Sequence, residues 1–203
     1  MCKLAEAQLG WTHLSMGELL RVERRADGPA AAMIEECMTG GKLVPNAIMV
    51  ALLKETMETV TRTTGKRNFL LDGFPRSMEN LEGWYEVYGE EADFPKMLYF
   101  ECPFEVLQKR ILARAKYSGR SDDNVESIKK GFDTFKAETL PTVEFFKSKD
   151  KCLEVDTSHD RQTVYDLVSQ NLAEHTDEKL AAKPLTERAE ILLGFRSYPR
   201  KEQ

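Results

Sequence analysis

Asn68-Phe-Leu-Leu-Asp-Gly-Phe-Pro-Arg76 is the stretch that decides the fold of this chain. Its apolar run, Phe69–Leu71, is typical of a strand buried in a parallel sheet. Asp72 ends the run, a glycine and a proline shape the turn, and Arg76 stands where a helical pattern begins. Because ligands bind at the carboxyl ends of strands in open α/β sheets, we predict a carboxylate and a guanidinium at a ligand-binding edge. The alternative is an ordinary turn followed by an incidental surface arginine.

Strands alternate with helical patterns on both sides of this stretch. Short strands are predicted at Trp11–Leu14, Met97–Phe100 and Cys152–Val155, with helices between them. A long helix is predicted from Asn124 to Lys147, interrupted at Pro141, which cannot donate a backbone hydrogen bond. The alternation predicts an α/β fold with a parallel sheet flanked by helices.

The last thirty or so residues differ from the rest of the chain. Residues 1–172 are long enough for one domain with a full core. Residues 173–203 carry mixed charges, and we predict one short helix there, at Leu185–Leu193. This C-terminal extension gives no indication of its role.

Composition narrows the classes of function. The chain has 203 residues, a hydrophobic share of 41%, a charged share of 31% and a net charge of −5. These values are typical of a globular protein, and they give no support for a nucleic-acid or membrane partner. No secretory leader and no C-x-x-C motif is present, so we expect reduced thiols and a cytoplasmic location, with the nucleus as the second choice. The cysteines are Cys2, Cys37, Cys102 and Cys152.

Arginines stand at predicted element ends or in a loop near the proposed ligand edge. Phosphoryl transfer depends on positioning and charge neutralisation, and guanidinium groups bind phosphate oxygens in pairs of hydrogen bonds. The alternative is that Arg110 and Arg114, four residues apart, share a solvated helix face. The arginines in question are Arg21, Arg76, Arg110, Arg114 and Arg120.

Three acids are candidates for chemistry, each with a structural alternative. Asp72 is placed like an acid that orients Mg²⁺ through water, or it caps a turn. Asp122 and Asp123 could bind metal or act in acid–base chemistry, cap the following helix, or pair with the arginines when a loop closes.

One motif expected of a phosphate-transfer enzyme is absent from the sequence. The glycine-rich G-x-x-x-x-G-K-[ST] loop does not occur. Thr39-Gly-Gly-Lys42 is the nearest stretch, but it follows a helix and Leu43 comes after the lysine. We interpret it as the end of that helix.

Several motifs in order resemble the nucleoside monophosphate kinases of the adenylate kinase family, and most closely the UMP-CMP kinase branch. The resemblance covers Cys2 to about Leu172, and the Asp72–Arg76 turn is its centre. It also rests on His13-Leu-Ser-Met-Gly-Glu-Leu-Leu-Arg21, Gly41-Lys-Leu-Val-Pro45 and Leu112-Ala-Arg-Ala-Lys-Tyr-Ser-Gly-Arg-Ser-Asp-Asp-Asn124. It implies a monophosphate-binding segment at about residues 15–44 and a short lid at about residues 113–123.

The resemblance also implies roles for single residues. Those implied to bind the monophosphate are Ser15, Gly17, Arg21, Lys42, Leu43, Val44, Gly73, Phe74, Pro75, Arg76, Asn80 and Arg120. Asn80 stands where the family reads the base, and its short amide favours pyrimidines. Those implied to bind ATP are Arg110, Arg114 and His159, and those implied to act in transfer are Arg76, Arg114 and Arg120. Asp72 would hold Mg²⁺ through water.

The sequence departs from the family at two places. It opens beyond the family's glycine-rich loop and first strand, which normally lies between the Phe69 and Met97 strands. We therefore expect these two strands to lack a partner, at about 1–3 kcal/mol for each unpaired buried group. Gly131 stands where the family carries another phosphate-binding arginine, and a glycine inside a helix costs about 1 kcal/mol relative to alanine.

The expected activity is transfer of the ATP γ-phosphate to UMP or CMP, impaired or absent in the chain as given. An adenylate kinase acting on AMP is the alternative enzyme. A non-catalytic nucleotide-binding or interaction relative is the alternative from another class, and Gly131 favours it. The implied partners are ATP, Mg²⁺ and UMP or CMP, and we expect a monomer.

Overall fold

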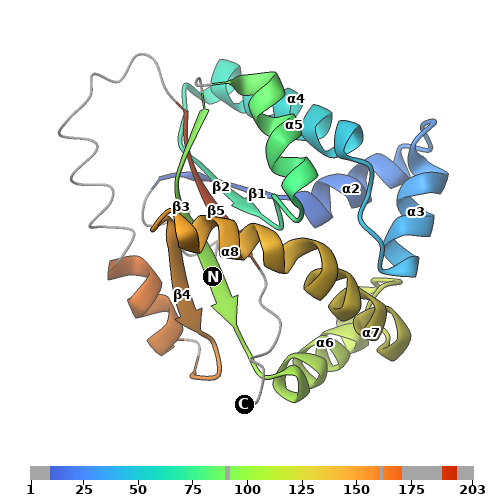
Figure 1. Cartoon of the computed structure of the whole chain (residues 1–203). Helices are drawn as coiled ribbons and strands as arrows, with labels where there is room; N and C mark the ends of the chain where they lie inside the picture. Colours follow the sequence, from blue (N-terminus) through green and yellow to red (C-terminus); the bar gives the residue numbers. More distant parts are fainter. Residues whose placement is uncertain (1–9, 90–91, 161, 171–188, 196–203) are drawn as a thin grey trace.

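The computed structural model describes residues 10–89, 92–160, 162–170 and 189–195 (Figure 1). The strands are β1 (Thr12–Ser15), β2 (Phe69–Asp72), β3 (Ala92–Glu101), β4 (Cys152–Asp156) and β5 (Ala189–Phe195). The helices are α2 (Met16–Arg25), α3 (Ala31–Gly40), α4 (Asn46–Thr64), α5 (Met78–Tyr88), α6 (Phe104–Ser118), α7 (Val125–Thr134) and α8 (Leu140–Ser148), with a π-helical segment, Phe135–Thr139, between α7 and α8. Residues 162–170 are also helical.

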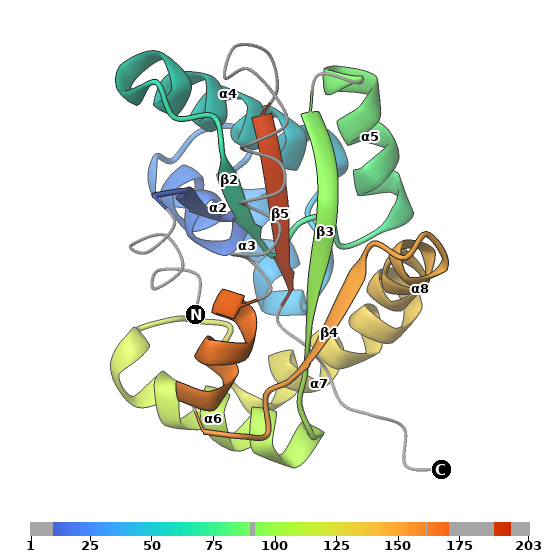
Figure 2. The same ribbon diagram turned by 90° about the vertical axis from the view of Figure 1, so that its left-hand side faces the viewer.

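The described strands form one parallel sheet in the order β1-β2-β5-β3-β4. Figure 2 shows β5 running between β2 and β3. The predicted α/β architecture is therefore confirmed.

The C-terminal strand β5 corrects two expectations. Residues 189–193, predicted to be helical, are strand, and the rest of the predicted Leu185–Leu193 helix lies outside the described residues. The expectation that β2 and β3 lack a partner is also wrong. Leu192 pairs with Leu70 on one side and with Lys96 on the other. A segment far away in the sequence thus fills the place between β2 and β3.

Buried apolar side chains cover both faces of the sheet. Successive strand residues point to opposite faces, so Phe69 and Leu71 pack in one cluster while Leu70 packs in the other. The larger cluster includes Leu53 of α4, Trp84 of α5 and Phe146 of α8. The smaller cluster includes Val164 and Val168 of the 162–170 helix. These two layers hold the sheet in place. The turns that follow β1 and β2 therefore start from the same edge of the sheet.

The long helix predicted from Asn124 to Lys147 is present in three parts. Asn124 caps α7 by accepting a hydrogen bond from the Ser127 backbone N–H. The π-helical segment precedes Pro141, which lies at the start of α8 and lacks the N–H that a continuous α-helix would use.

The beginning of α2 differs from expectation. Ser15 and Glu18, three residues apart, match the sequence pattern of a capping box at the start of a helix. Ser15 does precede α2, but its side chain makes no capping hydrogen bond, and Glu18 pairs with arginines instead. The sequence from Met1 to Leu9 has helical spacing of its apolar residues and predicts a helix, but these residues lie outside the described ranges. Within the described part of the chain, no helix combines the length and apolar character needed to cross a membrane.

Candidate functional site

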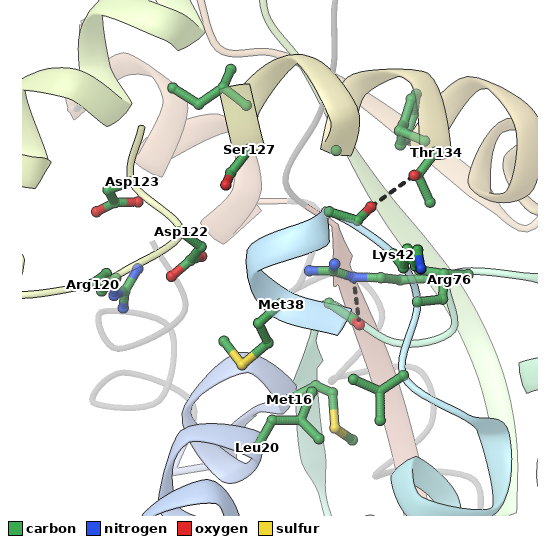
Figure 3. Close-up of a pocket in the computed structure, with 18 of the residues that line it drawn as sticks. Met16, Leu20, Met38, Lys42, Arg76, Arg120, Asp122, Asp123, Ser127 and Thr134 are labelled. Carbon is green, nitrogen blue, oxygen red and sulfur yellow. Dashed lines mark hydrogen bonds between the residues drawn. The ribbon is translucent and has the colours of Figure 1, made fainter. Parts of the chain in front are cut away.

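A cavity lies at the carboxyl ends of β1 and β2, under the turn that joins α3 to α4 (Figure 3). Helix α7 borders it on the side opposite α2. The labelled side chains in Figure 3 place Arg76 and Lys42 on one side and Arg120, Asp122 and Asp123 on the other. Both predicted ligand-binding regions, the turn after β2 and the lid, therefore face one space.

The turn after β2 places Arg76 at this cavity. Gly73 has a φ of +82°, a conformation that favours glycine, and a Cβ there would lie 3.1 Å from Nη2 of Arg76. The Arg76 Nε–H donates to the Gly73 carbonyl at 3.1 Å, and the Thr139 hydroxyl donates to the Arg76 carbonyl at 2.7 Å. The turn and the π-helical segment together fix the backbone of Arg76.

Glu18 stands between two arginines of the cavity wall. It accepts hydrogen bonds from Arg21, at 2.9 Å, and from Arg120. The hydrogen bond from Arg21 and the charges of both arginines lower the pKa of Glu18 from 4.5 to about 2, against the raising effect of burial. One carboxylate therefore pairs with two guanidinium groups of the cavity wall.

The two lid acids pair with arginines, which was one of three readings of the sequence. Asp123 is buried and accepts from both Nε and Nη2 of Arg114 and from the Ser118 hydroxyl. Burial would raise the pKa of Asp123, but these hydrogen bonds hold it below its ordinary value. Asp122 lies 3.8 Å from Nη1 of Arg21. Asn124, not either acid, caps α7.

Asp72 ends β2 next to a histidine on the neighbouring strand. The Nε2 atom of His13 lies 3.5 Å from Oδ2 of Asp72. Among the described residues there is no cluster of three or more His, Cys, Asp or Glu side chains that could hold a metal ion. The Asp72 carboxylate lines the cavity and fits Mg²⁺ held mainly by water and nucleotide phosphates, the usual arrangement in phosphate-transfer sites.

The α3–α4 turn lies directly against α7. A Cβ on Gly41 would come within 2.8 Å of the Gly131 backbone nitrogen. The hydroxyls of Ser127 and Thr134 donate to the carbonyls of Thr39 and Gly41, at 2.9 and 2.7 Å. Gly41 also ends α3 in the left-handed conformation, as predicted for Thr39-Gly-Gly-Lys42. The turn is thus held on the part of α7 that contains Gly131.

Residues 1–151 match the family described as adenylate kinase. The chain belongs to the adenylate kinase family. It is 40% identical over 171 residues to the UMP-CMP kinase of Homo sapiens, covering 83% of this chain and 87% of that protein. It is 39% identical over 165 residues to the uridylate kinase of Saccharomyces cerevisiae, covering 81% of this chain and 79% of that protein.

The cavity brings together most of the residues that the family resemblance singled out. They come from β1, α2, the α3–α4 turn, the turn after β2, α6 and the loop between α6 and α7. Those that line it are Ser15, Gly17, Arg21, Lys42, Leu43, Val44, Asp72, Gly73, Arg76, Arg114 and Arg120.

The other family positions lie away from the cavity wall. Phe74 and Pro75 are buried in the turn. Arg110 donates to the Thr157 carbonyl at 2.9 Å, at the end of β4. His159 is exposed, with Nε2 at 3.8 Å from Oδ2 of Asp156. Asn80 is 2% exposed and does not line the cavity; its amide bonds to the Arg76 backbone and to Asn46.

Sequence reasoning missed several residues that hold the wall of this cavity in place. Glu18 fits the sequence pattern of a capping box, which hides its pairing with Arg21 and Arg120. Thr134 and Thr139 hold the turns around the cavity through hydroxyl hydrogen bonds. No local pattern identifies them, because their partners lie 93 and 63 residues away.

Proposed function

We propose that this chain binds a pyrimidine nucleoside monophosphate and serves the transfer of the ATP γ-phosphate to UMP or CMP. The observation that carries the proposal is the convergence of Arg21, Arg76, Arg114 and Arg120 on one cavity. Several guanidinium groups around one space suit the dispersed charge of a transferring phosphoryl group. The names of the human and yeast relatives, UMP-CMP kinase and uridylate kinase, support the pyrimidine choice.

In this proposal the monophosphate lies between α2 and the turn after β2. Arg21 and Arg76 bind its phosphate, and the backbone of Lys42 to Val44 lines the nucleoside. Glu18 releases Arg120 when nucleotide enters, and Arg120 of the lid then reaches the transferring phosphate. Asn80, behind Arg76, contributes to reading the base.

The ATP side of the proposal rests on Arg110, Arg114 and His159. Asp72 would hold Mg²⁺ through water, and the ion would neutralise charge on the β- and γ-phosphates. Because the 203-residue sequence holds no G-x-x-x-x-G-K-[ST] motif, we expect monophosphate binding with negligible transfer by this chain alone.

A second candidate is a nucleotide-binding relative that does not transfer phosphate. Gly131 favours it, because this residue lines the cavity and offers no cation where the family resemblance implies an arginine. A site that prefers AMP to a pyrimidine nucleotide is the third option. Competition between AMP and UMP for the site distinguishes it from the first.

The test is titration calorimetry of the full chain with UMP, CMP and AMP, followed by a coupled assay with ATP and Mg²⁺. We expect UMP and CMP to bind more tightly than AMP. Replacing Arg76 with alanine removes a charged hydrogen-bond donor from the cavity and should weaken UMP binding by about tenfold or more.

The matched control is Arg110→Ala, which removes the same group outside the cavity and should leave the Kd for UMP nearly unchanged. If none of the three nucleotides binds, the proposal is wrong. Binding with no turnover, even after a glycine-rich strand and loop are joined to the chain, would support the non-catalytic candidate.

A further inference from the structure

Asn46, the first residue of α4, is hydrogen-bonded to Asn80 of α5. The Asn80 Nδ2 donates to the Asn46 Oδ1 at 3.2 Å across 34 positions of sequence. Asn46 comes two positions after Val44, and Asn80 comes four positions after Arg76. Both Val44 and Arg76 line the cavity. The hydrogen bond therefore ties together two stretches that each contribute a residue to the cavity wall.

We propose that Asn46 is a specificity-determining positioning residue, which fixes the orientation of the Asn80 amide behind the cavity wall and so sets which pyrimidine base the site prefers. This inference rests on the proposed function, in which Asn80 contributes to reading that base. Asn46 acts through Asn80 and does not itself need to touch the nucleotide.

Backbone groups decide which way the Asn80 amide points. The Arg76 backbone N–H can only donate, so the atom it meets at 3.0 Å must be the Asn80 oxygen. The amide nitrogen then points to Asn46, which must accept with its own oxygen. The Asn80 backbone N–H also donates to the Ser77 hydroxyl at 3.1 Å, which fixes the start of α5.

Gly83 provides the room that Asn46 needs. A Cβ at position 83 would lie 1.9 Å from the Asn46 Nδ2, a distance at which one of the two must move. Since Gly83 is buried inside α5, where glycine weakens a helix, its presence is explained by the close approach of the Asn46 side chain. The Asn46–Asn80 contact therefore depends on Gly83.

A fixed amide can distinguish uracil from cytosine. Uracil offers a carbonyl acceptor and an N–H donor, whereas cytosine offers an amino donor and a ring-nitrogen acceptor. An amide free to flip serves both bases equally. The Asn80 oxygen is held by Arg76 and its nitrogen is held by Asn46. The second N–H and the second oxygen lone pair of the amide are therefore fixed in one orientation. That arrangement suits one pyrimidine better than the other.

The experiment measures the ratio of the Kd values for UMP and CMP by titration calorimetry on the full chain. We expect the wild-type ratio to differ from one. Asn46→Ala removes one of the two anchors and should shift the ratio by about three- to tenfold, the value of one hydrogen bond. Asn46→Asp keeps an acceptor oxygen and should restore the wild-type ratio.

Gly83→Ala gives an independent route to the same effect, because it displaces Asn46. It should shift the ratio as Asn46→Ala does and should add nothing further in the Asn46→Ala background. Lys54→Ala, on the exposed face of α4, is the control and should leave the ratio unchanged.

Two kinds of failure are distinguishable. If wild-type protein binds UMP and CMP but the ratio equals one, or Asn46→Ala leaves it unchanged, the role of Asn46 is wrong and the proposed function stands. If wild-type protein binds neither nucleotide, the proposed function is wrong and this inference falls with it.

Discussion

Gly41 and Gly131 touch through their backbones, and a methyl group on Gly41 would lie 2.8 Å from the Gly131 nitrogen. This contact joins the α3–α4 turn to α7 over the cavity. Gly41 also has a φ of +66°, so two separate reasons favour glycine at this position. A side chain on Gly41 would therefore collide with the backbone of α7.

We predict that Gly41→Ala lowers the free energy of unfolding by more than the cost of its backbone conformation. The control is Gly65→Ala, since Gly65 has a φ of +74° and nothing within 4 Å of the added methyl. Gly65→Ala should cost about 1 kcal/mol, and Gly41→Ala about 1–3 kcal/mol more through overpacking. Equal urea midpoints for the two variants would contradict the close contact.

In the proposed function, Glu18 competes with a bound phosphate for Arg21 and Arg120. Glu18→Gln removes the competing charge, so we predict tighter binding of UMP, by about threefold or more. The Glu18 side chain is 53% exposed, so its loss should lower the free energy of unfolding by less than about 1 kcal/mol. Calorimetry and urea unfolding on the same variant separate the two effects. Weaker UMP binding would show that Glu18 helps to position the arginines.

The same residue predicts a pH dependence of stability. Its pKa is about 2 in the folded chain and 4.5 as the ordinary value, so Glu18 binds protons more readily in the unfolded chain. Its stabilising contribution is therefore complete above about pH 4.5 and disappears as the pH falls toward 2. Urea midpoints of wild type and Glu18→Gln should converge across this window. A constant difference between them from pH 6 to pH 2 would contradict the lowered pKa.

The strand β5 should be required for a stable sheet. Removing residues 189–203 leaves the facing backbone groups of β2 and β3 unpaired, at about 1–3 kcal/mol for each buried group. The summed cost of several such groups approaches the whole free energy of unfolding of an ordinary domain, about 5–15 kcal/mol. We expect loss of cooperative unfolding, measured by circular dichroism.

The control for β5 is removal of residues 196–203 alone, which leaves the paired strand in place and should unfold like the full chain. An unchanged melting temperature after removal of 189–203 would contradict the central position of β5. Leu192→Pro is a milder variant, because it removes one backbone donor from the middle of the strand.

Much of the fold follows from local patterns. The apolar run before Asp72, the end of α3 at Gly41 and the interruption before Pro141 were predicted from residues a few positions apart. Short-range periodicity and backbone chemistry determine such features. The assignment of Ser15 and Glu18 to a capping box was wrong because two distant arginines offered Glu18 a stronger, charged partner.

The sequence by itself determined the alternation of strands and helices, the turn that carries Asp72 and Arg76, and the motifs of the adenylate kinase family. Only the tertiary structure decided that residues 189–195 fill the middle of the sheet and that Asn46 holds Asn80. A short apolar segment such as Ile191–Leu193 fits a helix or a strand equally well, and the unpaired edges of β2 and β3 select the strand. The partners that settle such choices lie tens of residues away, beyond the reach of any local pattern.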